Sequence, residues 1–282
     1  MIWVLKRKVV SAPNTQTVIS RVEKFQVVPL HPTPYPELNA LLHELRASVQ
    51  TILGDRWIGM YLSGSLASGD FDPERSDIDF VIVTDDDLSA GMIQALEDLH
   101  TRIAASDSKW AKRLEGPYIA RQALRRYDPA HAQHPSVRVG GGFGIDYQGI
   151  DGIIQRFILR ERGVVVAGPA PSTLIDPVLP DDLRRASSGI LREWWEPQLQ
   201  DPFRLYVREY QAYAVLTMCR ILSTLQYGTV ISKPDAARWG KEALGKRRAV
   251  LSERALAWQP EDGVDDLNET LDFIRYTLER NS

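Results

Sequence analysis

Two aspartates one residue apart, Asp77 and Asp79, are the feature of this sequence that most strongly suggests chemistry, because they open an apolar segment that runs to Thr84. Residues i and i+2 of a strand point to the same face, so the two carboxylates are expected to lie side by side. Left alone they would repel each other, and one of them would take up a proton. Mg²⁺ removes this conflict, since it takes one or two protein carboxylates and completes its shell with water and phosphate oxygens.

A Gly-Ser step, Gly64 and Ser65, supplies the other half of a phosphate site, since it follows an apolar segment that starts at Trp57. A turn at this point presents backbone N–H groups and the Ser65 hydroxyl to phosphate, and glycine lets phosphate approach the backbone closely. Ser76 adds a hydroxyl next to the aspartates. Two metal ions ~3.5–4 Å apart would clamp the attacking and leaving oxygens of an in-line displacement. A hairpin with polar turn residues is the structural alternative for the Gly-Ser step alone.

The composition sets loose bounds on function. The 282 residues suffice for one large domain or two ordinary ones, and the net charge of −3 carries no polyanion-binding signature, so a dedicated nucleic-acid binder is disfavoured. One cysteine excludes an intrachain disulfide and a cysteine-cluster zinc site, and the five histidines show no metal-ligand spacing. No apolar run approaches the ~20 residues of a membrane span. We therefore expect a soluble, cytoplasmic, monomeric protein without a membrane partner.

Hydrophobic periodicity divides the chain into an α/β half and a helical half. The first half is predicted to contain helices over 36–53 and 88–105, strands from 57, over 77–84 and over 112–120, loops over 125–150, and a helix with a short strand over 152–169. Pro117 favours an edge position or a bulge for the strand 112–120. A proline-rich stretch over 169–180 precedes helical periodicity over 182–196, 203–227, 235–258 and 264–280. The predicted domains cover 1–30 (an N-terminal extension), 31–170 and 171–282.

The order and spacing of these residues resemble a known signature. The pattern Gly64-Ser65-x3-Gly69-x6-Ser76-Asp77-Ile78-Asp79 is similar to that of the polymerase-β-like nucleotidyltransferases. Within that superfamily the chain resembles, from about residue 37 to 260, the aminoglycoside adenylyltransferases that modify hydroxyls of streptomycin and spectinomycin. The segments RGVVVAGPAPSTLIDPV and VLTMCRILSTLQYGTVISKPDAARW carry this resemblance, while the linker between Gly69 and Ser76 is one residue longer than in those enzymes. The resemblance implies an α+β nucleotidyltransferase domain of polymerase-β-like fold, followed by a C-terminal α-helical bundle domain that closes the nucleotide and acceptor cleft.

A third acid is needed to hold the catalytic metal and to take the proton from the acceptor hydroxyl. Glu115, in the predicted strand 112–120, is the best-placed candidate, and by resemblance it matches the family's catalytic glutamate. A solvated glutamate at a strand end is the structural alternative. Asp146 and Asp151 are the other candidates, although the resemblance favours Asp151 as the N-cap of a helix.

The resemblance also assigns residues of the helical half to the nucleotide. Arg220 matches the arginine that reaches the ATP phosphates, and Lys233 matches its partner lysine. Cations contributed across the cleft would balance the excess negative charge of Mg-ATP and favour closure. Trp258 falls near the place where the family has an aromatic residue at the nucleotide, with a core tryptophan as the alternative.

The acceptor site is predicted at the start of the helical half, where the family binds its cationic antibiotic with acidic and aromatic side chains. Glu209 lies eleven residues before Arg220, about three turns at ~3.6 residues per turn, so both share one helix face with Tyr213 between them. The stretch 192–213 is several residues longer than in the family, and its acids do not align with the family's acids. Three further side chains are predicted to line this cleft, which are Trp194, Trp195 and Glu196. For the two tryptophans, packing in the core is the alternative.

These residues together predict a Mg²⁺- and ATP-dependent adenylyltransferase with two metal ions, which acts on a hydroxyl of a small cationic acceptor such as streptomycin or spectinomycin and releases pyrophosphate. One alternative keeps the chemistry with another small alcohol, a protein or a tRNA as acceptor, although the acidic balance disfavours tRNA. The other alternative is a non-catalytic nucleotide-binding module, which the intact acid pair disfavours. In the first hypothesis the metal ligands are Asp77, Asp79 and Glu115, and the ATP contacts are Gly64, Ser65, Ser76, Arg220, Lys233 and Trp258.

Overall fold

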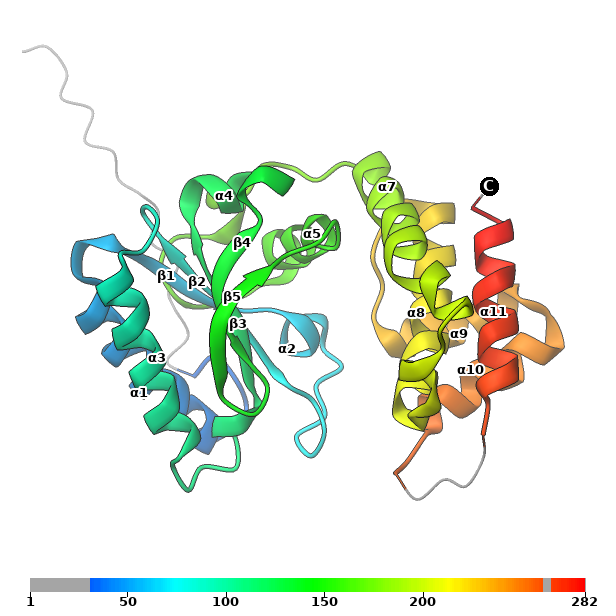
Figure 1. The fold of residues 1–282 in the computed structure, drawn as a ribbon, viewed down its shortest axis with the longest axis horizontal. Coiled ribbons are helices and arrows are strands. Elements are labelled where there is room, and N and C mark those ends of the chain that lie inside the picture. Colours follow the sequence, from blue (N-terminus) through cyan, green and yellow to red (C-terminus); the bar gives the residue numbers. More distant parts are fainter. Residues whose placement is uncertain (1–30, 261–264, 282) are drawn as a thin grey trace, which may run out of the picture.

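A mixed sheet with its helices and a separate bundle of helices form two lobes, which lie side by side along the long axis of the molecule in the computed structural model (Figure 1). The structure describes residues 31–260 and 265–281. The predicted N-terminal extension, 1–30, lies outside the described residues. Within the described ranges, no helix is long and apolar enough to cross a membrane.

The first lobe is built on six strands, which are β1 Trp57–Leu62, β2 Ile78–Thr84, β3 Leu114–Ala120, β4 Gln133–Arg138, β5 Gly142–Tyr147 and β6 Val164–Ala167. Their order across the sheet is β5-β4-β3-β2-β1-β6. The pair β2–β3 is parallel and the other pairs are antiparallel. The helices of this lobe are α1 Pro36–Leu53, α2 Gly64–Ser68, α3 Ala90–Ala104, α4 Arg121–Arg125, α5 Gly152–Arg162 and α6 Pro171–Leu174.

Alternation along β2 explains how the sheet buries two apolar faces. Phe80 and Ile82 belong to a core formed with α1 and α3. Val81 and Val83 belong to a second cluster on the opposite face, formed with α4, α5 and α6. Successive residues of a strand alternate between faces, so Asp79 shares the second face with Val81.

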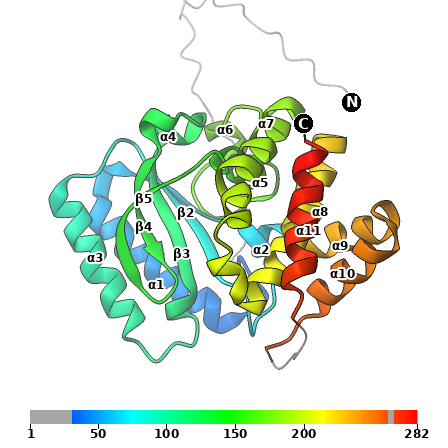
Figure 2. The ribbon, with the colours of Figure 1, turned by 45° about the vertical axis from the view of Figure 1, so that its right-hand side comes forward.

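The second lobe is a bundle of helices around α8. Its helices are α7 Pro180–Ile190, α8 Arg208–Tyr227, α9 Lys233–Ala243, α10 Gly245–Ala257 and α11 Leu267–Glu279, and a π-helical turn over Leu191–Trp195 extends α7. Ala214, Met218 and Ile221 on α8 are buried in a core to which α9, α10 and α11 also contribute. Figure 2 shows α11 lying against α8, with α9 and α10 next to them.

Three local predictions are wrong. The predicted loops over 125–150 contain the hairpin β4–β5, whose turn is made by Gly140 and Gly141 at φ 92° and 88°. The edge position predicted for the strand 112–120 is wrong, because β3 pairs with β2 on one side and with β4 on the other. The bulge that Pro117 also favours stays a prediction. The predicted helix over 235–258 is two helices, α9 and α10, which meet at Gly245 with φ 73°.

Polar contacts join the two lobes. Arg75 Nη1 donates to the carbonyl oxygen of Trp258 at 2.9 Å, and its guanidinium carbon lies 5.0 Å from the centre of that indole ring. Arg162 Nη2 donates to the carbonyl oxygen of Val230 at 2.8 Å. An apolar cluster that includes Ile158 of α5 and Leu183 of α7 also joins the lobes. The chain crosses between the lobes in the segment that links α6 to α7 (Figure 1), and the predicted boundary at residue 170 stays a prediction.

Candidate active site

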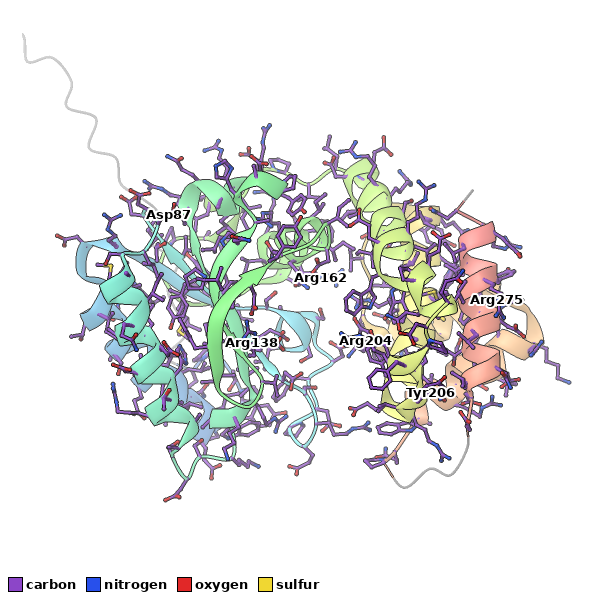
Figure 3. All side chains as sticks on the ribbon, viewed as in Figure 1. Asp87, Arg138, Arg162, Arg204, Tyr206 and Arg275 are labelled. Atoms are coloured by element: carbon purple, nitrogen blue, oxygen red, sulfur yellow. The ribbon has the colours of Figure 1, made fainter. Side chains whose placement is uncertain are left out.

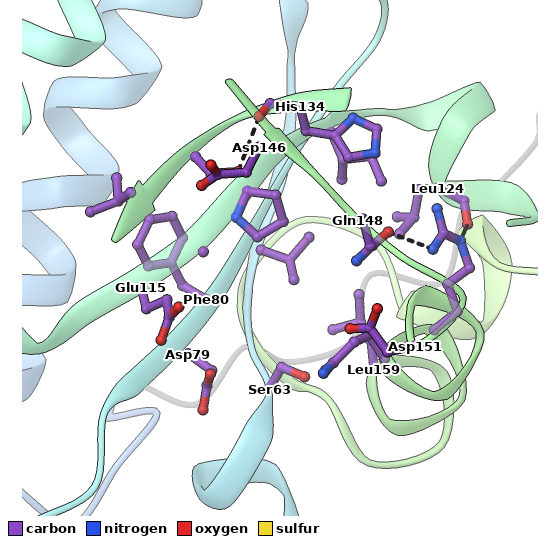
Figure 4. Close-up of a pocket in the computed structure, with 18 of the residues that line it drawn as sticks. Ser63, Asp79, Phe80, Glu115, Leu124, His134, Asp146, Gln148, Asp151 and Leu159 are labelled. Atoms are coloured by element: carbon purple, nitrogen blue, oxygen red, sulfur yellow. Dashed lines mark hydrogen bonds between the residues drawn. The ribbon is translucent and has the colours of Figure 1, made fainter. Parts of the chain in front are cut away.

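Two neighbouring strands bring acids together at the amino-terminal ends of β2 and β3. Asp79 is the second residue of β2, and the parallel register places it beside Glu115, the second residue of β3. Asp77 comes just before β2. Figure 4 shows Asp79 and Glu115 near each other on one side of a cavity. The structure thus gathers the three predicted acids at one edge of the sheet.

The positive charge around Asp77, Asp79 and Glu115 does not balance the charge of their carboxylates. Burial, followed by the charges of Asp79 and Asp77, raises the pKa of Glu115 from 4.5 to about 7. Burial and then the charge of Asp77 raise the pKa of Asp79 above its ordinary value. Burial also raises the pKa of Asp77, although the charges of Arg113 and Lys233 lower it. A bound cation would relieve the repulsion among the three groups.

Gly64 is required because the Asp79 carboxylate occupies the space of a side chain at that position. A Cβ on Gly64 would lie 1.8 Å from Asp79 Oδ2, and the backbone at Gly64 has φ +53°, in the left-handed region that favours glycine. The Ser65 amide donates a hydrogen bond to the Asp79 carboxylate, which partly counters the rise of its pKa. In this structure the Gly-Ser step therefore holds the acid. The predicted phosphate contacts of Gly64 and Ser65 stay predictions.

The donor set suits a Mg²⁺ ion that is completed by its substrate. Among the described residues, no group of three or more His, Cys, Asp or Glu side chains is gathered closely enough to hold an ion alone. Carboxylates on adjacent strands are nevertheless the hard oxygen ligands that Mg²⁺ takes in ones or twos, with water and phosphate oxygens at its other positions. Asp77, Asp79 and Glu115 fit such an ion in chemistry and in charge.

Arg113 fixes the loop that leads into β2. Its Nε donates to the carbonyl oxygen of Ser76 at 2.9 Å, its Nη1 to that of Pro73 at 2.6 Å, and its Nη2 also to Ser76. The Ser76 hydroxyl accepts the Asp72 amide at 2.9 Å, which closes the same turn. Sequence reasoning missed Arg113, although its place two residues before Glu115 puts it next to the predicted acids. A phosphate contact for Ser76 stays a prediction.

Charged residues of the helical lobe act on the acids across the lobe boundary. Lys233, the first residue of α9, lowers the pKa of both Asp77 and Asp79 by its charge, and its Nζ lies 5.8 Å from the ring centre of Tyr213. Glu209, exposed on the first turn of α8, raises the pKa of Asp77. The structure therefore brings Lys233 and Glu209 to the same side as the acid pair.

The other two residues assigned to the nucleotide also lie at the lobe boundary. Arg220 on α8 donates from Nε to the carbonyl oxygen of Ile231 at 3.1 Å. Burial lowers its pKa, and the charges of Tyr213 and of Asp70 in the sheet lobe partly counter this. Trp258 ends α10, where its ring contacts Arg75 of the sheet lobe. Their roles toward ATP stay predictions.

The predicted acceptor residues differ in exposure. Tyr213 is 42% exposed, and its ring centre lies 5.5 Å from that of Tyr210. Trp194 is exposed and donates from Nε1 to Tyr210 Oη at 2.9 Å. Trp195 is 1% exposed and packs against the rings of Tyr210 and Tyr213, so it supports them from the core and its burial disfavours direct contact with an acceptor. Figure 3 shows Arg204, whose guanidinium carbon lies 4.9 Å from the ring centre of Trp194, on the side of the helical lobe that faces the sheet lobe.

The two other candidates for the third acid lie on β5 and at the start of α5. Asp146 on β5 forms an ion pair with Arg138 on β4, whose Nε donates to it at 3.0 Å. Asp151 takes the N-cap position of α5, as predicted, but makes no side-chain capping bond there. Burial raises the pKa of Asp151. Glu115 remains the acid best placed beside Asp79.

Family comparisons agree with this geometry. The nucleotidyltransferase domain family matches residues 42–123, and the aminoglycoside adenylyltransferase C-terminal domain family matches residues 173–280. The first match contains Asp77, Asp79 and Glu115, and the second contains Arg220 and Lys233.

Individual relatives extend the agreement over most of the chain. The aminoglycoside (3″)(9) adenylyltransferase of Escherichia coli is 26% identical over 256 residues, which make up 85% of this chain and 94% of the relative. The crystal structure of spectinomycin adenyltransferase AAD(9) from Enterococcus faecialis, with ATP and spectinomycin, matches with a TM-score of 0.65 at 19% identity and covers 85% of this chain and 98% of the other. The predicted fold class, an α+β domain followed by a helical bundle, is confirmed.

Replacing Glu115 with Gln should stabilise the free protein at high pH. Because the pKa of Glu115 is raised from 4.5 to about 7, the folded chain holds this proton more tightly than the unfolded chain, and stability falls as pH rises through that window. Gln does not ionise. The melting temperature of Glu115→Gln should therefore exceed that of the wild type by roughly 1–4 °C at pH 8 and match it near pH 4, measured without Mg²⁺ or nucleotide.

The matched control is Glu97→Gln, at an exposed position on α3. It should change the melting temperature by the same amount at both pH values. A Glu115→Gln variant that is less stable than the wild type at pH 8 would contradict the electrostatic account.

Replacing Arg113 with Met should loosen the turn before β2 while the sheet stays folded. Met keeps an apolar stem near the Trp110 ring, which lies 4.9 Å from the guanidinium carbon, but it removes the donors to Pro73 and Ser76. Amide hydrogen exchange over residues 72–76 should become roughly tenfold faster or more, and exchange in β2 should be unchanged. Lys112→Met, at the exposed neighbouring position, is the control. Equal exchange rates over residues 72–76 in the Arg113→Met and Lys112→Met variants would show that the turn does not depend on the hydrogen bonds of Arg113.

Proposed function

We propose that this chain, whose two lobes match the nucleotidyltransferase domain and the aminoglycoside adenylyltransferase C-terminal domain families and which resembles the aminoglycoside (3″)(9) adenylyltransferase of Escherichia coli, transfers AMP from ATP to a hydroxyl of an aminoglycoside-type antibiotic. The observation that carries the proposal is the register of β2 and β3, which sets Asp79 beside Glu115 inside the matched nucleotidyltransferase domain. Streptomycin and spectinomycin are the proposed acceptors, in line with the name of the relative and with the acceptor bound in the structural neighbour.

The proposed reaction is an in-line displacement at the α-phosphorus of ATP. Glu115 takes the proton from the acceptor hydroxyl as the general base. The hydroxyl oxygen then forms a bond to the α-phosphorus while the bond from that phosphorus to the bridging oxygen breaks. Pyrophosphate leaves with the electron pair of the broken bond.

Asp77, Asp79 and Glu115 would hold two Mg²⁺ ions in this proposal. Bound Mg²⁺ neutralises phosphate oxygens and developing charge during the displacement. Ser65 keeps the Asp79 carboxylate oriented through its amide, and Gly64 leaves room for that carboxylate. The phosphate contacts are proposed to come from the Ser65 and Ser76 hydroxyls and from two cations of the helical lobe, Arg220 and Lys233. The Trp258 ring is proposed to lie against the adenine base.

The acceptor is proposed to bind on the helical side of the same cleft. Glu209 offers a carboxylate near Asp77, and Tyr213 and Trp194 offer exposed aromatic rings. Carboxylates and aromatic faces both attract ammonium and guanidinium groups, which suits a cationic antibiotic. Trp195 is proposed to position these rings from the core.

Incubating the purified protein with ATP, MgCl₂ and a panel of aminoglycosides that includes streptomycin and spectinomycin tests the proposal. We expect pyrophosphate release together with an antibiotic that carries one added AMP by mass spectrometry, and loss of both on chelation with EDTA. Adenylylation of another alcohol, a protein or a tRNA instead would move the chemistry to a different acceptor. ATP binding without turnover on any acceptor would identify a non-catalytic module.

Removing one charge of the acid pair should stop turnover without unfolding the protein. Asp77→Asn and Asp79→Asn keep the shape of the side chain but lose a metal-binding carboxylate, so turnover should fall by roughly 10²-fold or more. Melting temperatures without nucleotide should stay level or rise, because the repulsion is relieved. Asp98→Asn, at an exposed position on α3, is the control and should keep wild-type turnover. Near-wild-type turnover in either site variant would refute the metal assignment.

ATP and acceptor should bind cooperatively, because the proposed phosphate cations lie in one lobe and the acids in the other. Calorimetry on the inactive Glu115→Gln variant should show acceptor binding that is weak alone and at least about tenfold tighter with Mg-ATP. Linkage requires the acceptor to tighten ATP by the same factor. Arg220→Ala should weaken ATP binding and abolish the coupling, whereas Glu209→Gln should weaken acceptor binding and spare ATP. Equal acceptor affinity with and without nucleotide would show that the pocket is preformed.

A further inference from the structure

A buried histidine lines the cavity next to the predicted catalytic acids. The cavity measures about 230 Å³ and extends from Asp79 and Glu115 to Asp151 at the start of α5 (Figure 4). His134, on β4, lines it and is 5% exposed. Its Nε2 is buried and has no hydrogen-bond partner in the described part of the chain. A buried polar nitrogen without a partner is unfavourable, so a ligand in the cavity is the natural source of one.

Two other buried polar side chains of this cavity, Arg156 and Ser136, have partners within the protein. Arg156, 4% exposed, donates from Nε to the carbonyl oxygen of Leu124 at 3.0 Å and from Nη1 to Gln148 Oε1 at 2.7 Å. The Ser136 hydroxyl donates to the carbonyl oxygen of His134 at 3.1 Å. These bonds fix the walls of the cavity, whereas the bonding of His134 Nε2 is incomplete.

The chemistry of His134 selects the group that it would bind. Burial, assisted by the charge of Arg156, lowers the pKa of His134 to about 4, so the imidazole is neutral at pH 7. A neutral ring nitrogen is either a donor or an acceptor, depending on the tautomer, and a hydroxyl group satisfies both cases because it donates and accepts. The Arg156 guanidinium disfavours a cation beside His134, whereas the carboxylates of Asp79, Glu115, Asp146 and Asp151 line other parts of the cavity. The part of the cavity around His134 therefore suits a hydroxyl group of a ligand.

The size of the cavity limits what enters it. Pockets that enclose whole drug-sized ligands measure ~300–1,000 Å³, so about 230 Å³ holds one ring of a larger molecule. The apolar walls, which include Val81, Ile119 and Leu159, suit the C–H faces of such a ring. Glu115 at the other wall lies on the proposed path of the acceptor proton.

Resting on the proposed function, we infer that this cavity is the subsite for one hydroxylated ring of the acceptor, with a ring hydroxyl bonded to His134 Nε2 and the reacting hydroxyl presented to Glu115. His134 is thus a residue that determines acceptor specificity and takes no part in binding ATP.

Steady-state kinetics of His134→Phe and His134→Gln test this subsite, with spectinomycin and streptomycin as acceptors. His134→Phe keeps a ring but removes the nitrogen, so the KM for the acceptor should rise about tenfold or more, while the KM for ATP stays within about twofold. His134→Gln restores a hydrogen-bonding group and should recover part of the loss. The melting temperature of His134→Phe should not fall, because an unpaired buried nitrogen is removed. His131→Phe, at an exposed position three residues away, is the matched control and should behave as the wild type.

Three outcomes would overturn the inference, and they are distinguishable. If the wild type adenylylates an antibiotic and His134→Phe keeps the same acceptor KM, the subsite is wrong and the proposed function stands. If the melting temperature falls and both KM values rise together, His134 is a structural residue. If the wild type modifies no member of the antibiotic panel, the proposed function fails and the subsite fails with it.

Discussion

Repulsion among Asp77, Asp79 and Glu115 is the interaction on which the rest of the structure depends. Asp79 and Glu115 are neighbours because β2 and β3 pair in parallel, and a parallel pair needs a crossover, which α3 supplies. The acids stand at the amino-terminal ends of their strands, where the carboxyl end of α3 returns the chain. That end of a helix carries partial negative charge, so α3 adds no electrostatic relief. Positive charge must come from side chains, which explains the roles of Arg113 in the sheet lobe and Lys233 in the helical lobe.

The same need for positive charge links the acids to the helical lobe. Lys233, on α9, lowers the pKa of both aspartates by its charge. Arg220 lies at the same boundary, where the charge of Asp70 partly counters the fall of its pKa. The loop before β2 is tied on both sides, by Arg113 within its own lobe and by Arg75 to the carbonyl oxygen of Trp258 in the other. A shift of one lobe against the other would therefore reach Asp77 through this loop. In the proposed function, nucleotide binding would be coupled to lobe position through these few contacts.

The acids and the two-lobe architecture were predictable from sequence because their signals are local. A period of two sets Asp77 and Asp79 on one face, and helical periodicity marks α7 to α11. The hairpin β4–β5 was not predicted, since its strands are short and largely polar. Because this hairpin was missed, the pairing of β4 with β3, which makes β3 internal, was missed as well. Arg113 and His134 became visible only in three dimensions, because one acts on a loop far earlier in the chain and the other depends on a cavity that the hairpin helps to form. Trp195 was predicted to line the cleft, but it is buried in the core of the helical lobe.

The unfavourable groups of the free protein share one face of one sheet. Asp79 and Glu115 carry raised pKa values, and His134 Nε2 lacks a partner, all around a single cavity. The opposite face of the same strands is apolar, with Phe80 buried between α1 and α3. Because successive side chains of a strand point to opposite faces, residues of β2 and β3 that pack in the core alternate with residues that line the cavity. A metal ion with its nucleotide would neutralise the first two groups, and a hydroxylated ligand would satisfy the third. Binding of both proposed ligands would therefore add stability where the free protein has its least favourable groups.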